Sequence, residues 1–168
     1  DNRLVGSEMC IRDRVVAVSM SEPGAGTALS DLKTKAEIKG DKIVINGTKR
    51  WCSGAGHSDG YVVYARMSDA PAAKGIGAVY VELERDGLTF GNSESLMGFR
   101  GIPSADIYFD NVEVPIENLL VEPEDGFKKL METFERVNCF AVLDSPPMKY
   151  CYLVVGNGTP WNPQLLPL

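Results

Sequence analysis

The sequence has few residues of the kinds that build metal and acid–base sites. His57 is the single histidine, and the four cysteines show no C-x-x-C spacing, so no metal site is expected. No two carboxylates are placed by spacing for acid–base catalysis, and nothing resembles a catalytic triad. The sequence therefore names no catalytic residue.

Long apolar runs and an excess of positive charge are also missing. No run approaches the roughly 20 apolar residues of a membrane-spanning helix, and no signal peptide is recognisable. The net charge of −6 argues against nucleic acid or an anionic membrane as the main partner. We therefore expect an intracellular or organellar protein, whose 168 residues suit one ordinary domain.

Short runs with strand composition fill the first two thirds of the chain. Residues 33–39 alternate between charged and smaller or apolar side chains, which predicts a half-buried strand with Thr34, Ala36 and Ile38 on one face. Asn46-Gly47 is the preferred pair for a type I′ hairpin, so we expect a turn there. Similar runs are found at 15–20, 42–45, 48–52, 61–67, 77–83, 88–90 and 105–114. This spacing predicts a mainly β fold, an antiparallel barrel or sandwich of about seven strands, over residues 15–122.

The period changes after the acidic segment 122–125. Apolar residues at helical spacing predict an amphipathic helix over 123–138, with Phe127, Leu130, Met131, Phe134 and Val137 on its apolar face. Residues 1–14 resemble a translated adapter sequence, or form an ordinary polar tail. Residues 139–168 contain half of the prolines, and we interpret them as an irregular tail or the product of a shifted reading frame.

Three motifs have both a structural and a functional interpretation. The segment S-E-P-G-A-G-T at 21–27 is either a Pro–Gly turn between strands or a loop whose glycines let backbone N–H groups approach a ligand. It lacks the third glycine of a dinucleotide fingerprint. Trp51 is either a core residue or a stacking platform, and the small residues after it would give a flat ligand room. The arginine in Gly98-Phe99-Arg100-Gly101 is either a loop residue or the mark of a subgroup.

These motifs resemble one known family. The segments S-M-S-E-P-G-A-G-T-A-L-S-D-L, G-D-K-I-V-I-N-G-T-K-R-W-C-S-G and G-F-R-G-I-P-S-A-D-I-Y-F-D-N-V-E-V-P resemble, in order and distance, the middle β-domain of the acyl-CoA dehydrogenases. The resemblance covers roughly residues 15–138, and residues 125–136 look like the first helix of the family's C-terminal domain. It implies an FAD enzyme that removes two hydrogens from an acyl-CoA thioester, with hydride passing to flavin N5.

The resemblance also implies roles for individual residues. Met20 and Ser21 match the positions that touch the polar edge of the flavin through backbone N–H and hydroxyl groups. Trp51 matches the aromatic residue packed against the isoalloxazine, and Ser53 a hydroxyl residue near N5. Cys52, between them, replaces a common isoleucine in the cofactor-binding segment. A further position, Thr27, matches a serine that contacts acyl-CoA.

Several parts of the family's enzyme are not recognisable here. The N-terminal helical domain and nearly all of the C-terminal bundle, which usually carries the glutamate base, are absent from the sequence. We therefore expect this chain alone to bind FAD weakly and to lack activity. For the intact protein the resemblance implies an electron transfer flavoprotein as acceptor, a homotetramer, and a bacterial cytoplasm or mitochondrial matrix. The alternatives are an acyl-CoA oxidase or flavin monooxygenase of the same superfamily, or a non-catalytic β-barrel module.

Overall fold

The computed structural model describes residues 15–98, 101–124 and 128–132, all within the first of two compact units, Asp1–Glu132. Within these ranges the chain forms the strands β1 (Val16–Ser19), β2 (Lys35–Lys39), β3 (Lys42–Ser53), β4 (Gly60–Arg66), β5 (Ile76–Glu82), β6 (Leu88–Phe90), β7 (Ser104–Pro115) and β8 (Leu119–Val121). Short 3-10 turns are η1 (Leu29–Asp31), η2 (Ala72–Gly75) and η3 (Ile116–Asn118), and residues 128–132 are helical. The predicted mainly β fold followed by a helix is confirmed.

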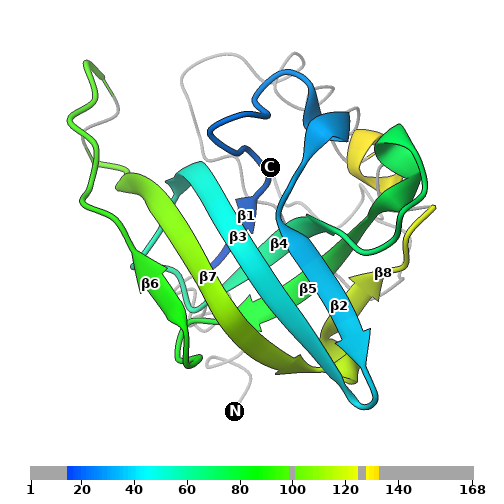
Figure 1. The fold of residues 1–168 in the computed structure, drawn as a ribbon. Coiled ribbons are helices and arrows are strands. Elements are labelled where there is room, and N and C mark those ends of the chain that lie inside the picture. The colour runs from blue at the N-terminus through cyan, green and yellow to red at the C-terminus, as the bar shows by residue number, and fades with distance from the viewer. Residues whose placement is uncertain (1–14, 99–100, 125–127, 133–168) are drawn as a thin grey trace, which may run out of the picture. The chain divides into compact units, whose positions relative to one another are not determined.

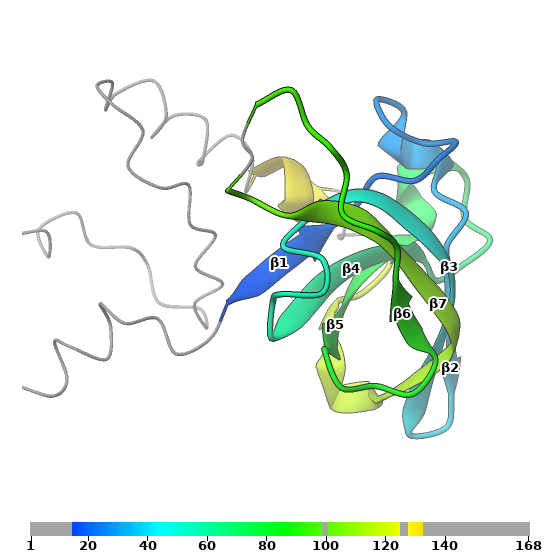
Figure 2. The same ribbon diagram turned by 90° about the vertical axis from the view of Figure 1, so that its left-hand side faces the viewer.

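The strands form one curved, open sheet in the order β6-β7-β3-β2-β4-β5-β8. Most neighbours are antiparallel, while β1 runs parallel to β4, and β2 meets β4 in parallel at a single pair of residues. In Figure 1, β7, β3 and β2 lie in front of β4 and β5, and Figure 2 shows the sheet curling round between them. The main core fills this curl, with β3, β4, β5 and β7 supplying most of its side chains.

A second, smaller apolar cluster lies around the loop that follows β1. Val62 and Tyr64 of β4 and Ile76 and Ala78 of β5 pack there with Ala25, Leu32 and the helical residue Leu130. The side chain of Met20 lies partly buried against the same cluster. Packing on both sides of β4 and β5 explains why these strands are almost wholly apolar.

The predicted hairpin at Asn46-Gly47 is wrong, because β3 runs through it without turning. Opposite Asn46, β7 contains a bulge, and the Asn46 side chain accepts a hydrogen bond from the Asn111 N–H at 2.8 Å. Gly47 has φ 147°, and a Cβ there would lie 2.6 Å from Thr34 Oγ1. Glycine is needed here because β3 passes close to Thr34. A tight turn would have selected the same residue type.

The predicted inner face of residues 33–39 is correct at two of its three positions. Thr34 and Ala36 are buried, but Ile38 is 52% exposed. Beyond Lys35, β2 has only β3 as a neighbour, so Ile38 lies at a free edge. The short strand β8 was not predicted, because three residues give too little pattern to recognise.

Parts of the chain singled out above lie outside the described residues. These are the tails 1–14 and 139–168, Arg100 of the glycine-flanked turn, and Phe127, Phe134 and Val137 of the predicted helix face. Leu130 is buried and Met131 half-buried, as expected for that face. No helix in the described ranges is both long and apolar enough to span a membrane.

Candidate functional site

The loop after β1 lies along the second half of β3, which brings the two ends of the 18–54 segment together. Lys49 Nζ donates to the Met20 carbonyl oxygen at 2.9 Å, and the Arg50 N–H donates to the Ser21 carbonyl oxygen at 2.8 Å. Cys52 Sγ lies 3.5 Å from the Val18 carbonyl oxygen. The glycine-rich loop and the tryptophan segment are therefore neighbours in space.

A bulge in β3 controls the direction of the Trp51 side chain. The flanking register pairs are Lys49 with Ile107 and Cys52 with Ala105. Between them β3 has two residues, Arg50 and Trp51, where β7 has one, and Trp51 adopts φ 58°. Trp51 is consequently 50% exposed, whereas Cys52 is 3% exposed. Bulges occur often beside functional sites because they redirect a side chain in this way.

Arg50 covers part of the Trp51 ring. Its guanidinium carbon lies 4.8 Å from the ring centroid, within the range of a cation–π contact. Glu94 and Asp106 each approach the same guanidinium at 3.8 Å. With the cation held on one face, the remaining exposed ring surface is available to a flat ligand.

The other predicted residues differ in accessibility. Ser53 is exposed beside Trp51, and Ser21 is half-buried. Thr27 is exposed beyond the Pro23-Gly24 turn, which Glu22 and Ala25 close with two backbone hydrogen bonds of 3.1 Å. A Cβ at Gly24 or Gly26 would meet nothing within 4 Å, so the loop surface is open to approach.

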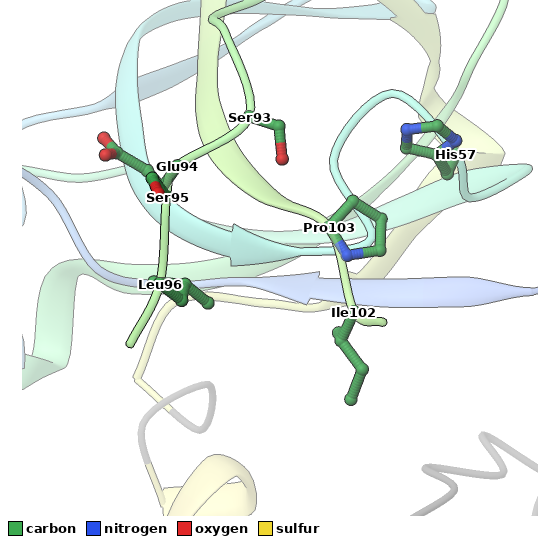
Figure 3. A pocket seen from close by; sticks show the side chains of 7 residues that line it. All are labelled: His57, Ser93, Glu94, Ser95, Leu96, Ile102 and Pro103. Atoms are coloured by element: carbon green, nitrogen blue, oxygen red, sulfur yellow. The ribbon is translucent and has the colours of Figure 1, made fainter. Parts of the chain in front are cut away.

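A hollow of about 420 Å³ lies near the Gly54–His57 turn and contains none of the predicted site residues (Figure 3). Its lining residues are His57, Ser93, Glu94, Ser95, Leu96, Ile102 and Pro103. The backbone connects it to the tryptophan segment, because the Gly54 N–H donates to the Pro103 carbonyl oxygen at 2.7 Å.

A buried ion pair beneath the loop was not predicted from the sequence. Lys49 Nζ lies 2.8 Å from Glu22 Oε1, and the two side chains are 0% and 5% exposed. Glu22 also accepts the N–H groups of Lys33 at 2.7 Å and Thr34 at 3.0 Å. The alternation of β3 could have indicated that Lys49 is buried, because Lys49 lies an even number of residues from the inward-facing Ile43.

Burial and hydrogen bonding shift the pKa values of this pair. Burial alone would raise the pKa of Glu22, but the hydrogen bond and charge of Lys49, together with the two N–H donors, lower it below its ordinary value. Burial lowers the pKa of Lys49, and Glu22 offsets part of that effect. With three donors in place, the Glu22 carboxylate is not a free general base.

Burial also raises the pKa of the Cys52 thiol to about 11, despite opposing effects of Ser19 and Lys49. The thiol is therefore protonated and unreactive near neutral pH. Since it points inward, only the backbone of Cys52 is left to contact a ligand at the Trp51 surface. Among the described residues, no His, Cys, Asp and Glu side chains cluster as a metal site would require.

The donor set suits a flavin. An isoalloxazine ring has two flat apolar faces and one edge of carbonyl oxygens and ring nitrogens. The half-exposed Trp51 ring offers a stacking surface, while the nearby Met20–Ser21 backbone and the hydroxyls of Ser21 and Ser53 offer polar partners. The residues present therefore fit this group.

Comparison with known proteins identifies relatives across this region. The model of the acyl-CoA dehydrogenase middle domain matches residues 17–112. A cyclohex-1-ene-1-carbonyl-CoA dehydrogenase of Geobacter metallireducens is 41% identical over 129 residues, 76% of this chain and 34% of that protein. The mitochondrial short-chain specific acyl-CoA dehydrogenase of Homo sapiens is 37% identical over 123 residues, 73% of this chain and 30% of that protein.

Solved structures give the same result. The butyryl-CoA dehydrogenase of Megasphaera elsdenii matches with a TM-score of 0.70 and 33% identity, over 74% of this chain and 33% of that one. The chain thus spans about a third of the length of these relatives. Because the family model matches more than half of the chain, in the part that carries the Met20–Ser21 loop and Trp51, the chain belongs to the acyl-CoA dehydrogenase family and contains its middle domain.

Proposed function

We propose that this chain supplies one side of the FAD and acyl-CoA site of an enzyme that dehydrogenates an acyl-CoA thioester between its α and β carbons. The observation that carries this proposal is Trp51, which a β-bulge holds half-exposed beside the Met20–Ser21 loop. FAD, when bound, supplies the acceptor for the hydride. In this proposal the described residues bind and orient FAD and the acyl-CoA. The base that removes the α-proton is expected outside them.

Each predicted residue has a role in this proposal. Trp51 would pack against the isoalloxazine ring, and the Ser53 hydroxyl would lie near its N5. The backbone N–H groups of Met20 and Ser21 and the Ser21 hydroxyl would donate to the polar edge, where such donors stabilise the negative charge of the reduced ring. Cys52 contributes backbone only, and Thr27 contacts acyl-CoA through its hydroxyl.

The remaining features of this proposal are carried over from the family. The intact protein is a homotetramer that passes electrons to an electron transfer flavoprotein, in a bacterial cytoplasm or a mitochondrial matrix. The chain spans about a third of the length of these relatives, and we expect it by itself to bind FAD weakly and not to turn over acyl-CoA.

The test is a titration of the purified chain with FAD, followed by flavin fluorescence quenching. Quenching by the wild-type chain should be lost in Trp51→Ala and kept in Tyr108→Ala, which removes another exposed aromatic from the neighbouring strand. Equal quenching by both variants would refute the flavin site and favour a non-catalytic module. Reduction of a dye with butyryl-CoA by the chain alone would contradict the predicted inactivity, and oxygen consumption during turnover would favour an oxidase or monooxygenase.

A further inference from the structure

The peptide that joins Met20 to Ser21 is held from the interior of the protein. Its carbonyl oxygen accepts a hydrogen bond from Lys49 Nζ at 2.9 Å, and the Lys49 side chain is completely buried. The carbonyl of the next peptide is held too, because Ser21 O accepts the Arg50 N–H at 2.8 Å. Two successive carbonyl groups therefore point towards β3.

Peptide geometry converts this constraint into a direction for an N–H group. In a trans peptide the C=O and the following N–H point in opposite directions, and the described residues contain no cis peptide bond. Holding the Met20 carbonyl on Lys49 therefore directs the Ser21 N–H away from Lys49. This N–H belongs to the loop proposed to meet the polar edge of the flavin.

The ammonium group is itself held in place. Glu22 Oε1 lies 2.8 Å from Lys49 Nζ, and the two oxygens of Glu22 accept the N–H groups of Lys33 and Thr34, the two residues just before β2. A chain of hydrogen bonds thus runs from these two residues, through Glu22 and Lys49, to the Met20 carbonyl. Every step is buried or partly buried, so water competes little for the partners.

Packing alone does not account for charged residues at this position. Two buried charges gain little net stability over apolar side chains of the same volume, because their desolvation offsets their attraction. An apolar pair would fill the space but could not hold a carbonyl group. The distinctive property of Lys49 is thus the hydrogen bond to Met20.

We propose that the Glu22–Lys49 pair is a positioning device that fixes the Met20 carbonyl and thereby aims the Ser21 N–H at the electron-accepting edge of the flavin. The inference rests on the proposed FAD site and adds two residues that do not touch the cofactor. A hydrogen bond from this N–H favours the reduced, more negative ring. The pair therefore acts on both the affinity for FAD and its reduction potential.

The experiment compares Lys49→Met with Lys42→Met in the full chain. Both replace a lysine of β3 by a side chain of similar length, but Lys42 forms its ion pair, with Glu113 at 2.8 Å, on the exposed surface. Lys49→Met should weaken FAD binding about tenfold, the effect of losing one buried hydrogen bond to the ligand. Lys42→Met should leave the affinity unchanged. All titrations are run where circular dichroism shows the variants folded.

Two further measurements separate positioning from a purely structural role. In the wild type, the Ser21 amide proton should move downfield in NMR spectra when FAD is added, and this shift should disappear in Lys49→Met. At saturating FAD, the midpoint potential of the flavin should be lower in Lys49→Met than in the wild type. A change in stability alone would move neither quantity. If Lys49→Met does not fold, the double variant Glu22→Leu/Lys49→Met, which buries no charge and also lacks the donor to the Met20 carbonyl, replaces it with the same expectations.

The outcomes distinguish the two proposals. FAD binding by the wild type with an unmoved Ser21 amide, or with equal potentials in both forms, would overturn the positioning role and leave the flavin site standing. No FAD binding by the wild type would overturn the proposed function, and the positioning role with it.

Discussion

The Glu22–Lys49 pair makes an asymmetric prediction about stability. Removing Lys49 leaves the Glu22 carboxylate with two backbone N–H donors, from Lys33 and Thr34. Removing Glu22 leaves Lys49 with the Met20 carbonyl as its remaining partner, and it also deprives both N–H groups of their acceptor. Glu22→Leu should therefore destabilise the fold more than Lys49→Met.

The magnitudes follow from the number of orphaned groups. Breaking a buried ion pair costs about 3–5 kcal/mol, and Lys49→Met should lie near 3 because Glu22 stays partly satisfied. Glu22→Leu orphans two N–H groups at about 1–2 kcal/mol each and an ammonium at about 2, giving roughly 5 kcal/mol. The double variant has no buried charge but still orphans the Lys33 and Thr34 N–H groups, so it should cost about 3 kcal/mol. Adding Lys49→Met to Glu22→Leu should therefore restore about 2 kcal/mol of the lost stability.

Urea unfolding followed by circular dichroism measures these differences, with Lys42→Met as the exposed control. The urea midpoint should be lowest for Glu22→Leu, and higher and similar for the double variant and Lys49→Met. Additive losses, with the double variant the least stable, would refute the reasoning.

The pH dependence of stability provides a second readout. Because folding lowers the pKa of Glu22, its contribution is present above its ordinary pKa of 4.5 and is lost as the pH falls through the lower folded value. Acid sensitivity in this range should be reduced in Glu22→Leu.

Three shorter predictions concern single positions. Cys52, with a pKa raised to about 11, should react with Ellman's reagent at pH 8 only after unfolding, as peptide mass spectrometry of the labelled chain can establish; fast native labelling would contradict its burial. Gly47→Ala should destabilise the chain by more than about 3 kcal/mol through overlap with Thr34, while Gly26→Ala, which meets nothing, should stay within about 0.5, as thermal melts can check. Trp51→Gly should be about 1 kcal/mol more stable than Trp51→Ala, because only glycine relieves φ 58°; equal melting temperatures would argue against strain at this position.

The sequence predicted the strands well because alternation is a local signal of which side chains are buried. It failed at Asn46-Gly47, where two different demands select the same glycine. A hairpin needs positive φ, and the crossing of β3 over Thr34 needs the absence of a Cβ. The prediction that Ile38 faces inward was wrong for a related reason, since its exposure depends on how far β4 extends beside β2. Such information lies in the pairing of distant segments and not in the local pattern.

The residues of the candidate site also differ in how far the sequence alone could predict them. Trp51, Ser21 and their neighbours were identified by resemblance to a family, which carries information that physical pattern alone did not supply. The Glu22–Lys49 pair was accessible to physical reasoning, because Lys49 falls in phase with inward-facing residues of β3. A charged residue at an inward position needs a partner, and the nearest loop offered Glu22. Its carbonyl partner, Met20, could be recognised only in three dimensions.

The conformation of Trp51 argues for a ligand on energetic grounds. Strict alternation along β3 from Ile43 and Lys49 would turn Trp51 into the core and Cys52 outward, whereas the bulge does the reverse. Because the ring is already half-buried, burying the rest of the indole would have contributed about 1.5 kcal/mol, and the positive φ adds a cost of about 1 kcal/mol. The contact with Arg50 returns about 1 kcal/mol of this difference. The balance is unfavourable in the chain as it stands, and a flat ligand stacked on the exposed half of the ring would restore the lost burial. Under the proposed function, the bulge at Arg50–Trp51 gives up stability in exchange for a binding surface.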